Sequence, residues 1–232
     1  MRATLDIAHE MLKAISLCHN YNRWIYRTIK PYLGKRILEV GCGVGNLTRY
    51  LLESGEVVGL DCSQRYVDYM KLDFPDLEVY NYDIADEKVL VLKKYGFDTV
   101  VCINVLEHVE DDLKALSNMY ELIEGKGRLV LLIPAHRFLY GTPDRNVGHW
   151  RRYSKKQLFD KLSVTKFKVE RIEYFNKVGI IGWFLNSKIV RGKQISFLQL
   201  ILFNEFVPFF AKIDSLVKLP LGLSIFATGI KV

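Results

Sequence analysis

A glycine-rich turn is the feature of this sequence whose residue types and spacing point most directly to ligand chemistry. Its glycines are Gly41, Gly43 and Gly45; a short predicted strand precedes them at residues 36–40, and a helical pattern follows from about Asn46. Where a buried strand turns into a helix, glycines let a ligand lie against the backbone, and the free N–H groups of the helix N-terminus can bind it. The pattern therefore predicts a site at which the backbone contacts a ligand closely.

Two carboxylates follow at the ends of the next two apolar segments. Asp61 ends a predicted strand at 57–61, twenty residues after Gly41, and Asp83 follows a predicted strand at 77–82. A carboxylate in the position of Asp61 can accept hydrogen bonds from both hydroxyls of a ribose, and Asp83 can reach an adenine amino group. Because open α/β sheets bind ligands at the carboxyl ends of their strands, these residues and the glycine turn predict a nucleoside site.

The elements that must position these groups alternate along the chain. The pattern predicts an N-terminal helical region over 4–30 with a break at 20–24, and helices at 46–53, 66–72, 113–123 and 155–162. It predicts strands at 36–40, 57–61, 77–82, 97–103, 127–133, 166–175 and 223–231, with a loop at 135–153. Strands that alternate with helices favour an α/β fold with a parallel sheet and right-handed crossovers.

The residues around the turn separate two classes of nucleotide-binding protein. A dinucleotide fingerprint needs a third glycine where Asn46 stands, so a dinucleotide oxidoreductase is disfavoured. With Glu39 the pattern is instead E-x-G-x-G-x-G, and the sequence resembles the class I S-adenosylmethionine-dependent methyltransferases. The motifs ILEVGCGVGNLT, VVGLDCS, YNYDIAD, FDTVVCINVLEHVED and GKGRLVLLIP occur in the family's order over roughly residues 20–175. The LEHV signature is similar to that of the ubiquinone-biosynthesis O-methyltransferase branch.

The resemblance implies a Rossmann-like, doubly wound, mostly parallel seven-stranded sheet that binds S-adenosylmethionine and releases S-adenosylhomocysteine. It implies that the glycines hold the amino-acid part of the cofactor, that Glu39 holds the turn or reaches the ammonium group through water, and that Asp61 binds the ribose. The remaining cofactor-binding residues that it implies are Cys62 beside the adenine, Asp83 and Ile84 around the base, Asn104 at the methionine part, and Tyr21 and Trp24 as a lid.

Two histidines near the expected site are candidates for removing a proton from an acceptor hydroxyl, namely His149 and His108. His108 follows Glu107, and some relatives hold a divalent cation with a Glu-x-x-Glu-His pattern. Here Asn104 occupies the first position, which leaves that ligand set incomplete. We therefore expect no metal, with Glu107 and His108 as the ligands that remain if one binds.

The segment after the fifth predicted strand concentrates side chains suited to an anionic or sugar-like acceptor. The predicted acceptor-binding residues are His136, Arg145, Trp150, Arg152 and Tyr153. The alternative is that His149 and Arg152 simply tie a long loop to the domain through hydrogen bonds. The sequence leaves the two alternatives open.

The apolar segment 176–222 has two interpretations. It folds as lid helices packed on the sheet, which we favour, or it forms an acceptor pocket or a face that rests on a membrane. The basic residues that would suit an anionic bilayer are Lys188, Arg191, Lys193, Lys212 and Lys218. In the second case the acceptor would be hydrophobic or lipid-linked.

Composition limits the class of protein. The chain has 232 residues, 50% of them hydrophobic, which suits one domain with a packed core. We expect a single domain over 1–232 with an N-terminal helical lid (1–33), a cofactor-binding core (34–175), an apolar helical insertion (176–222) and a last strand (223–232). Four cysteines without a CxxC pair predict free thiols in a reducing cytosol. A signal peptide and a run of eighteen apolar residues are both absent from the sequence, so we expect a cytoplasmic protein, with peripheral membrane contact as an alternative.

The net charge of +7 permits nucleic acid, anionic lipid or an acidic substrate as a partner and does not choose among them. The predicted function is transfer of a methyl group, in line, to a small-molecule or lipid- or sugar-linked acceptor, with oxygen as the expected target. The alternatives are a catalytically silent S-adenosylmethionine-binding module and a methyltransferase acting on nucleic acid or protein. The sequence predicts no oligomeric state.

Overall fold

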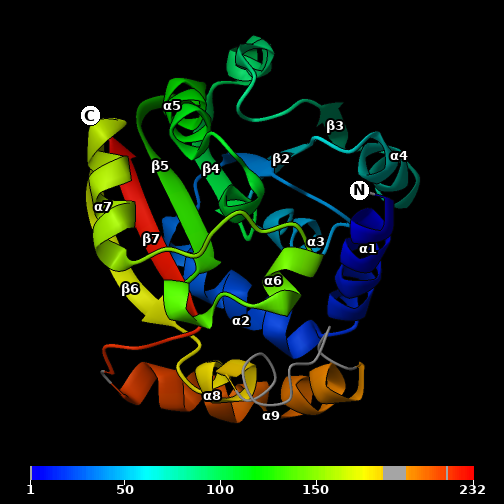
Figure 1. The fold of residues 1–232 in the computed structure, drawn as a ribbon. Coiled ribbons are helices and arrows are strands. Elements are labelled where there is room, and N and C mark those ends of the chain that lie inside the picture. Colours follow the sequence, from blue (N-terminus) through cyan, green and yellow to red (C-terminus); the bar gives the residue numbers. More distant parts are fainter. Residues whose placement is uncertain (1, 185–196, 218) are drawn as a thin grey trace.

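A single seven-stranded sheet organises the chain (Figure 1). The structure is a computed structural model that describes residues 2–184, 197–217 and 219–232. The strands are β1 (Arg36–Val40), β2 (Glu56–Asp61), β3 (Glu78–Asn81), β4 (Phe97–Ile103), β5 (Ile123–Pro134), β6 (Phe167–Phe175) and β7 (Ser224–Lys231). Their order is β3-β2-β1-β4-β5-β7-β6, and β7 runs antiparallel to both of its neighbours while the other pairs are parallel. The predicted α/β fold with a mostly parallel sheet is confirmed.

Helices cover both faces of the sheet. The α-helices are α1 (Arg2–Ser16), α2 (His19–Ile29), α3 (Thr48–Leu51), α4 (Gln64–Asp73), α5 (Asp112–Leu122), α6 (Thr142–Asn146), α7 (Lys155–Val164), α8 (Gly179–Phe184) and α9 (Phe197–Leu216). Short 3-10 helices are η1 (Lys30–Tyr32), η2 (Glu87–Tyr95), η3 (Leu106–His108) and η4 (Arg137–Leu139). The core on one face joins the sheet to α5, α7 and η2, and the core on the other joins it to α2 and α3.

The apolar runs of the central strands are explained by this double cover. In β4 the side chains of Val100 and Cys102 are buried on one face, and Val101 is buried on the other. Because successive residues of a strand point to opposite faces, a strand covered on both sides needs apolar residues at every position. This requirement determines which segments form the central strands, and the ends of those strands determine where the loops at the carboxyl edge begin.

The N-terminal helical region breaks earlier than predicted, at Leu17 and Cys18 rather than within 20–24. The reason is a contact from far along the chain. The side-chain oxygen of Asn204 accepts hydrogen bonds from the backbone N–H groups of Asn20 (3.0 Å) and Tyr21 (3.2 Å). It thereby satisfies two of the N–H groups that the start of a helix leaves unpaired.

Several short helices were not predicted. Helices α6 and η4 lie within the expected loop 135–153, and η2 and η3 lie in segments to which we assigned no element. In η2, Val89 and Leu92 are buried three residues apart, which is the period of a 3-10 helix. Asp86 caps its start by accepting from the backbone N–H of Lys88, and Gly96 ends it in the left-handed conformation. These signals were present in the sequence.

The segment 176–222 contributes α8 and α9, which lie together at one end of the molecule, below α2 in Figure 1. Lys188, Arg191 and Lys193 of the predicted basic flank fall in 185–196, and they and Lys218 lie outside the described residues. None of the helices in the described part of the chain combines the length and the apolarity that crossing a bilayer requires.

Candidate functional site

A cavity of about 1190 Å³ opens at the carboxyl edge of the sheet, where Val40, Asp61, Ile103 and Pro134 end β1, β2, β4 and β5. The sequence-predicted cofactor residues that line it are Tyr21, Glu39, Gly41, Gly43, Asp61, Cys62, Asp83, Ile84 and Asn104. From the predicted acceptor, proton-transfer and metal-ligand residues it adds Glu107, His108, His149, Trp150 and Arg152. Ligand pockets are commonly about 300–1,000 Å³, so this cavity has room for a cofactor and an acceptor together.

The glycine turn depends on the left-handed backbone. Gly41 has a φ of +73° and Gly45 a φ of +76°, a region that strains other residues. A Cβ on Gly41 would lie 2.3 Å from the side chain of Val105, and one on Gly45 would lie 2.5 Å from the ring of Phe74. The first glycine thus lets the loop after β4 approach the turn. Gly45 lets α4 pack behind it and does not itself line the cavity.

Asp61 is held rigidly at the floor of the cavity. Its carboxylate accepts hydrogen bonds from the backbone N–H groups of Gly43 (3.0 Å) and Ser63 (2.9 Å). Burial raises the pKa of Asp61 above its usual value, and the two backbone hydrogen bonds oppose that shift. Since each carboxylate oxygen has a second lone pair, Asp61 keeps acceptor capacity for hydroxyl groups of a ligand.

Glu39 is buried directly beneath the turn. The Thr48 hydroxyl donates to its carboxylate at 2.5 Å. Burial raises the pKa of Glu39 to about 8, and the nearby Asp61 adds to the shift while the Thr48 hydrogen bond opposes it. A cationic group bound beside Glu39 would favour the ionised form, so this side chain suits the ammonium end of a ligand.

The loop after β3 forms the far end of the cavity. The Asp83 carboxylate is exposed and accepts from the backbone N–H of Ala85 at 2.8 Å. Ile84 is buried, and its backbone oxygen accepts from the Asn118 side chain at 2.8 Å, which fixes the loop to α5. An apolar side chain beside a free carboxylate can sandwich a planar base and bind its amino group.

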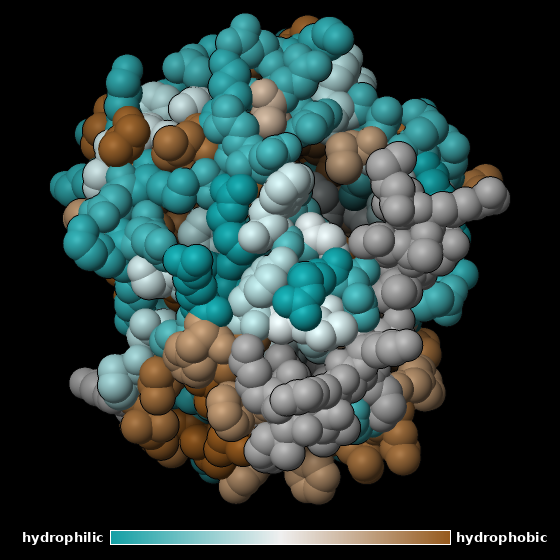
Figure 2. All heavy atoms as spheres, in the orientation of Figure 1, coloured by the Kyte–Doolittle hydropathy of each residue, from teal (hydrophilic) through white to brown (hydrophobic). Residues whose placement is uncertain are grey.

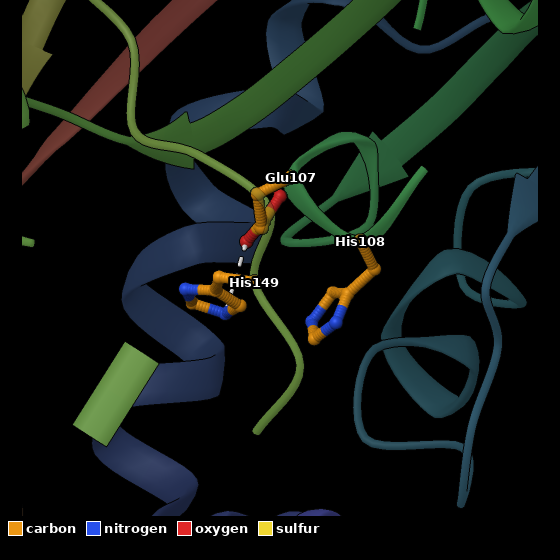
Figure 3. Close-up of side chains that lie close together, drawn as sticks. All are labelled: Glu107, His108 and His149. Carbon is orange, nitrogen blue, oxygen red and sulfur yellow. Dashed lines mark ion pairs between the residues drawn. The ribbon is translucent and has the colours of Figure 1, made fainter. Parts of the chain in front are cut away.

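A cluster of ionisable side chains stands at the other end (Figure 3). The Nδ1 atom of His149 lies 2.9 Å from Oδ1 of Asp144, and its Nε2 atom lies 3.9 Å from Oε1 of Glu107. The ring of His108 meets that of His149 edge-on, with centroids 4.6 Å apart. Arg152 donates from Nε to the same Asp144 oxygen at 2.8 Å. The buried pair of Asp144 and Arg152 therefore orients His149.

The environment shifts the protonation of this cluster. Burial raises the pKa of Glu107 to about 7 although His149 opposes the shift, and neither carboxylate oxygen has a hydrogen-bond partner among the described residues. His108 keeps an exposed side chain, but desolvation by the surrounding protein, followed by the charge of His149, lowers its pKa to about 4. Burial alone would raise the pKa of Asp144, but the hydrogen bond from His149 and the charge of Arg152 outweigh it and lower that pKa. Asp144 is thus ionised and His108 neutral near pH 7.

The same cluster satisfies a distance requirement for metal binding. One ligand atom from each of Glu107, His108 and His149 lies within 4.8 Å of the other two. One carboxylate and two imidazoles are a ligand set that divalent transition metals accept. The sequence pattern suggested only the first two, because His149 comes from a loop forty-one residues after His108.

Between the glycine turn and the ionisable cluster, the cavity has an apolar wall, which the segment 176–222 largely provides. Residues of α2, α8 and α9 line it, together with the segments before α2 and α8; they include Cys18, Val178, Ile181, Trp183, Leu200, Phe203 and Phe210. The ring of Trp183 lies over the Arg152 guanidinium, 4.5 Å from ring centroid to carbon. The structure thus gives this segment a cavity-lining face, which the favoured lid interpretation did not include.

Several predicted residues do not reach the cavity. Trp24 was expected in a lid, but its ring packs on Phe175 at 4.2 Å within the core, because α2 turns that side toward the sheet. His136 was expected to bind the acceptor, but its ring stacks on Tyr174 at 4.8 Å outside the cavity. Burial lowers the pKa of His136.

Two further acceptor candidates occupy other places. Arg145 is exposed on α6 and donates to the Thr142 hydroxyl at 3.0 Å, away from the cavity. Tyr153 is buried, and its hydroxyl donates to Asp112 at 2.8 Å, so it anchors the loop to α5. Tyr153 instead borders a second, smaller cavity. Tyr153 thus anchors the loop, a role that we expected only of His149 and Arg152, while Arg152 both anchors the loop and lines the cavity.

Sequence reasoning missed Asp144 and the inward faces of α8 and α9. Asp144 precedes His149 by five residues, a spacing that matches neither helix nor strand periodicity. The sequence shows that Asp144 is close to His149 along the chain, but the contact between the carboxylate and the ring depends on the turn of α6. The inward face of α9 was hidden because apolar residues occur all round this helix.

Comparisons with known proteins relate part of the chain to methyltransferases. Residues 38–129 match the family described as a methyltransferase domain. A ubiquinone biosynthesis O-methyltransferase of Coxiella burnetii is 35% identical over 98 residues, which are 41% of this chain and 42% of the relative. A tRNA U34 carboxymethyltransferase of Ectopseudomonas mendocina is 34% identical over 116 residues, 47% of this chain and 36% of the relative. The matches thus span less than half the length of these curated relatives.

Solved structures of methyltransferases have a fold similar to that of this chain. A SAM-dependent methyltransferase from Archaeoglobus fulgidus superposes with a TM-score of 0.60 at 17% identity, covering 90% of this chain and 94% of that one. A SAM-dependent methyltransferase from Thermotoga maritima, titled a possible histamine N-methyltransferase, superposes with a TM-score of 0.63 at 16% identity, covering 98% and 99%. The predicted resemblance is therefore confirmed for the methyltransferase domain and for the fold.

Proposed function

The chain carries a methyltransferase domain of the S-adenosylmethionine-dependent class, and from this premise we propose that it methylates a hydroxyl group of a largely apolar acceptor. The single observation that carries the proposal is the pair of Asp144 and His149, 2.9 Å apart at one end of the cavity. At the other end, Asp61, Glu39 and the glycine turn offer the groups that a nucleoside and an amino acid require.

When bound, S-adenosylmethionine supplies the methyl group as an electrophile on sulfonium sulfur. The part of the protein is to align the acceptor oxygen with that group, which in favourable systems contributes roughly 7–11 kcal/mol. Asp61 and the turn hold one end of the cofactor, and the Asp83 loop holds the base. The acceptor oxygen then lies beside His149.

His149 accepts the proton that the hydroxyl loses. Because Asp144 holds Nδ1, the Nε2 atom is the one left for the acceptor proton, and the ionised Asp144 stabilises the imidazolium that forms. The oxygen lone pair forms the O–CH₃ bond while the S–CH₃ bond breaks. The proton passes from Nε2 to solvent after the methylated product leaves.

The three side chains in Figure 3 support a second candidate mechanism. A divalent cation bound by Glu107, His108 and His149 would coordinate the acceptor hydroxyl and lower its pKa. Our expectation remains that no metal is needed, since Asp144 already positions His149 as a base. Removal of divalent cations with a chelator distinguishes the two mechanisms.

The cavity wall favours an acceptor with an apolar chain. Phe203 and Phe210 line the cavity, and the Phe210 ring contacts that of Phe206, which is 57% exposed. Ile181 lines the cavity and is also 62% exposed. An unbroken apolar path thus leads from the cavity to the outer face of α8 and α9, where Figure 2 shows apolar side chains gathered below the polar body of the protein.

We therefore propose that this outer face rests on an anionic bilayer, from which an acceptor reaches the cavity. Exposed apolar side chains on it are Ile181, Phe184, Phe197, Leu198, Leu202, Phe206, Phe209, Leu216, Leu219 and Leu221. Lys212 is exposed on α9, and the chain carries a net charge of +7. Amphipathic helices bind membranes through such apolar area combined with attraction to anionic lipids.

The experiment that tests the reaction compares the wild type with Asp61→Asn. Calorimetry should give saturable S-adenosylmethionine binding that the variant weakens at least about tenfold, since a ribose would lose a charged hydrogen-bond acceptor. S-adenosylhomocysteine should then accumulate with prenylated phenols and not with tRNA. Cofactor binding without S-adenosylhomocysteine for any acceptor would favour the silent binding module, and product formed on tRNA alone would contradict the apolar acceptor.

A further inference from the structure

A second cavity, of about 420 Å³, adjoins the first and is strongly basic. It is formed by η4, the chain from Trp150 to Tyr153, and α7. Its lining residues are Arg137, Tyr140, Trp150, Arg151, Arg152, Tyr153, Gln157 and Lys161. Four of these eight side chains are cationic, and none is acidic. The basic pocket, as we call it, therefore presents hydrogen-bond donors and positive charge.

The acids that stabilise this arrangement lie behind the wall. Asp112 is buried and binds Lys161 at 2.6 Å and Arg151 at 2.9 Å, while Asp144 binds Arg152 at 2.8 Å. Two carboxylates thus face four cations, which leaves a surplus of positive charge directed at the pocket. Among the side chains that the structure describes, that of Arg137 makes no hydrogen bond and no ion pair.

The basic pocket communicates with the first cavity. Trp150 and Arg152 line both, and Trp150 is 55% exposed at the shared rim. The backbone N–H of Trp150 donates to the backbone oxygen of Glu107 at 2.8 Å, which fixes the rim against the ionisable cluster. A ligand held in the pocket would therefore extend past Trp150 toward His149, the residue before it in the chain.

We propose that the basic pocket binds a phosphate group, and that the methyl acceptor carries this group. Arginine and lysine side chains that converge on one cavity without an acid in its wall match the charge and the several acceptor oxygens of a phosphate. Binding of phosphate is independent of the proposed methyl transfer. The assignment of the phosphate to the acceptor rests on that proposed function.

The test uses inorganic phosphate as the probe, with acetate at equal ionic strength as the comparison. Isothermal titration of the wild type should show saturable phosphate binding that is stronger than acetate binding. Arg137→Gln should weaken phosphate binding about tenfold, and Arg137→Lys should retain part of it. The matched control is Arg145→Gln, which removes the same charge from an exposed arginine of the same loop outside both cavities and should change binding less than about twofold.

Three readouts keep the proposal falsifiable. An unchanged melting temperature in both variants shows that the fold is intact, and unchanged S-adenosylmethionine binding separates loss of the pocket from failure of the proposed reaction. Equal losses in Arg137→Gln and Arg145→Gln, or no saturable phosphate binding in the wild type, would overturn the proposal.

Two further probes identify the source of the phosphate. Competition by glucose 1-phosphate would assign the pocket to a soluble phosphate ester. Binding to vesicles that contain phosphatidic acid, lost in Arg137→Gln and kept in Arg145→Gln, would assign it to a lipid phosphate. Glucose 1-phosphate that does not compete, together with phosphatidic acid vesicles that do not bind, would mean an adventitious ion only. That outcome would contradict the assignment of the phosphate to the acceptor.

Discussion

The side-chain oxygen of Asn204 lies 3.0 Å from the backbone nitrogen of Asn20, so a residue of α9 caps the start of α2. The contact is reciprocal, since the Asn20 amide donates to the backbone oxygen of Asn204 at 3.1 Å. The next residue, Tyr21, lines the cavity and donates its backbone N–H to the same side chain. The position of Tyr21 in the site thus depends on a helix far along the chain.

Asn204→Ala should destabilise the protein by about 1–2 kcal/mol, the usual cost of losing an N-cap side chain. Urea unfolding monitored by circular dichroism measures this change. Ser215→Ala, which removes a small polar group from an exposed position of the same helix, is the control and should stay within about 0.5 kcal/mol of the wild type. An equal effect of both variants would mean that Asn204 does not act as the cap.

His149→Asn should lower kcat by about 10²–10⁴-fold, the contribution of a general base, and should leave S-adenosylmethionine binding unchanged. The measurement is the initial rate of S-adenosylhomocysteine formation with a saturating acceptor. His136→Asn serves as the control, because His136 lies outside the cavity and asparagine tolerates its positive φ of 61°. A His149→Asn enzyme with full activity would exclude His149 as the base.

Glu107 should make the protein less stable as the pH rises. Its folded-state pKa, raised by burial to about 7, exceeds the unfolded value, so the folded protein holds the proton more tightly. The stability due to this group is therefore fully present below the unfolded pKa of about 4.3 and is lost as the pH rises through about 7. The loss is on the order of 4 kcal/mol at most.

Urea unfolding of wild type and Glu107→Gln between pH 5 and pH 8 measures this contribution. The variant should lose less stability over this range, although Glu39, whose pKa burial raises to about 8, leaves a similar slope in both proteins. Glu110→Gln, which changes an exposed acid three residues later, should follow the wild type. Parallel curves for wild type and Glu107→Gln would contradict a raised pKa at Glu107.

Dialysis against a chelator should leave the methylation rate unchanged, because Asp144 and His149 need no cation to act as a base. The rate is measured before dialysis, after it, and after addition of Mg²⁺ or Mn²⁺. Activity that disappears with the chelator and returns with the metal in the wild type, but not in His108→Ala, would favour the metal site of Glu107, His108 and His149.

Replacing Phe206 and Phe209 together by serine should weaken binding to anionic vesicles, since the two side chains are 57% and 61% exposed on the outer face of α9. Co-sedimentation with vesicles of phosphatidylserine and phosphatidylcholine measures the binding, and added salt should reduce it. Leu72→Ser is the control, because Leu72 is 85% exposed on α4, away from this face. Wild-type protein that forms a dimer, and a double variant that is monomeric, would instead show that the face binds a second copy.

The sequence predicted those parts of the fold that follow from local patterns. The strand at 97–103 has the predicted bounds, because a strand covered on both faces is apolar at most of its positions. The glycine turn was also predictable, since its spacing and the following Asp61 reflect backbone geometry within a single strand-turn-helix unit. Residues 37–61 therefore carry most of the information on the cofactor end.

Local sequence patterns could not predict the contacts between distant segments. Glu107 and His149 come together because the loop after β5 folds back over η3, and no periodicity reports that approach. Trp24 was misplaced for the same reason: the helix pattern gives its face but not the partner, which is Phe175. The earlier start of α2 depends on Asn204 from the last helix. Tertiary contacts, rather than local propensity, determine these features.

The position of β7 has a consequence for folding during synthesis. This strand pairs with both β5 and β6, so β6 joins the sheet only after residues 224–231 have been made. Until then β6 has no partner strand, and the edge of β5 that β7 will cover is also open. Unpaired strand edges of this kind can pair with other chains. Slow translation just before β7 should therefore increase aggregation.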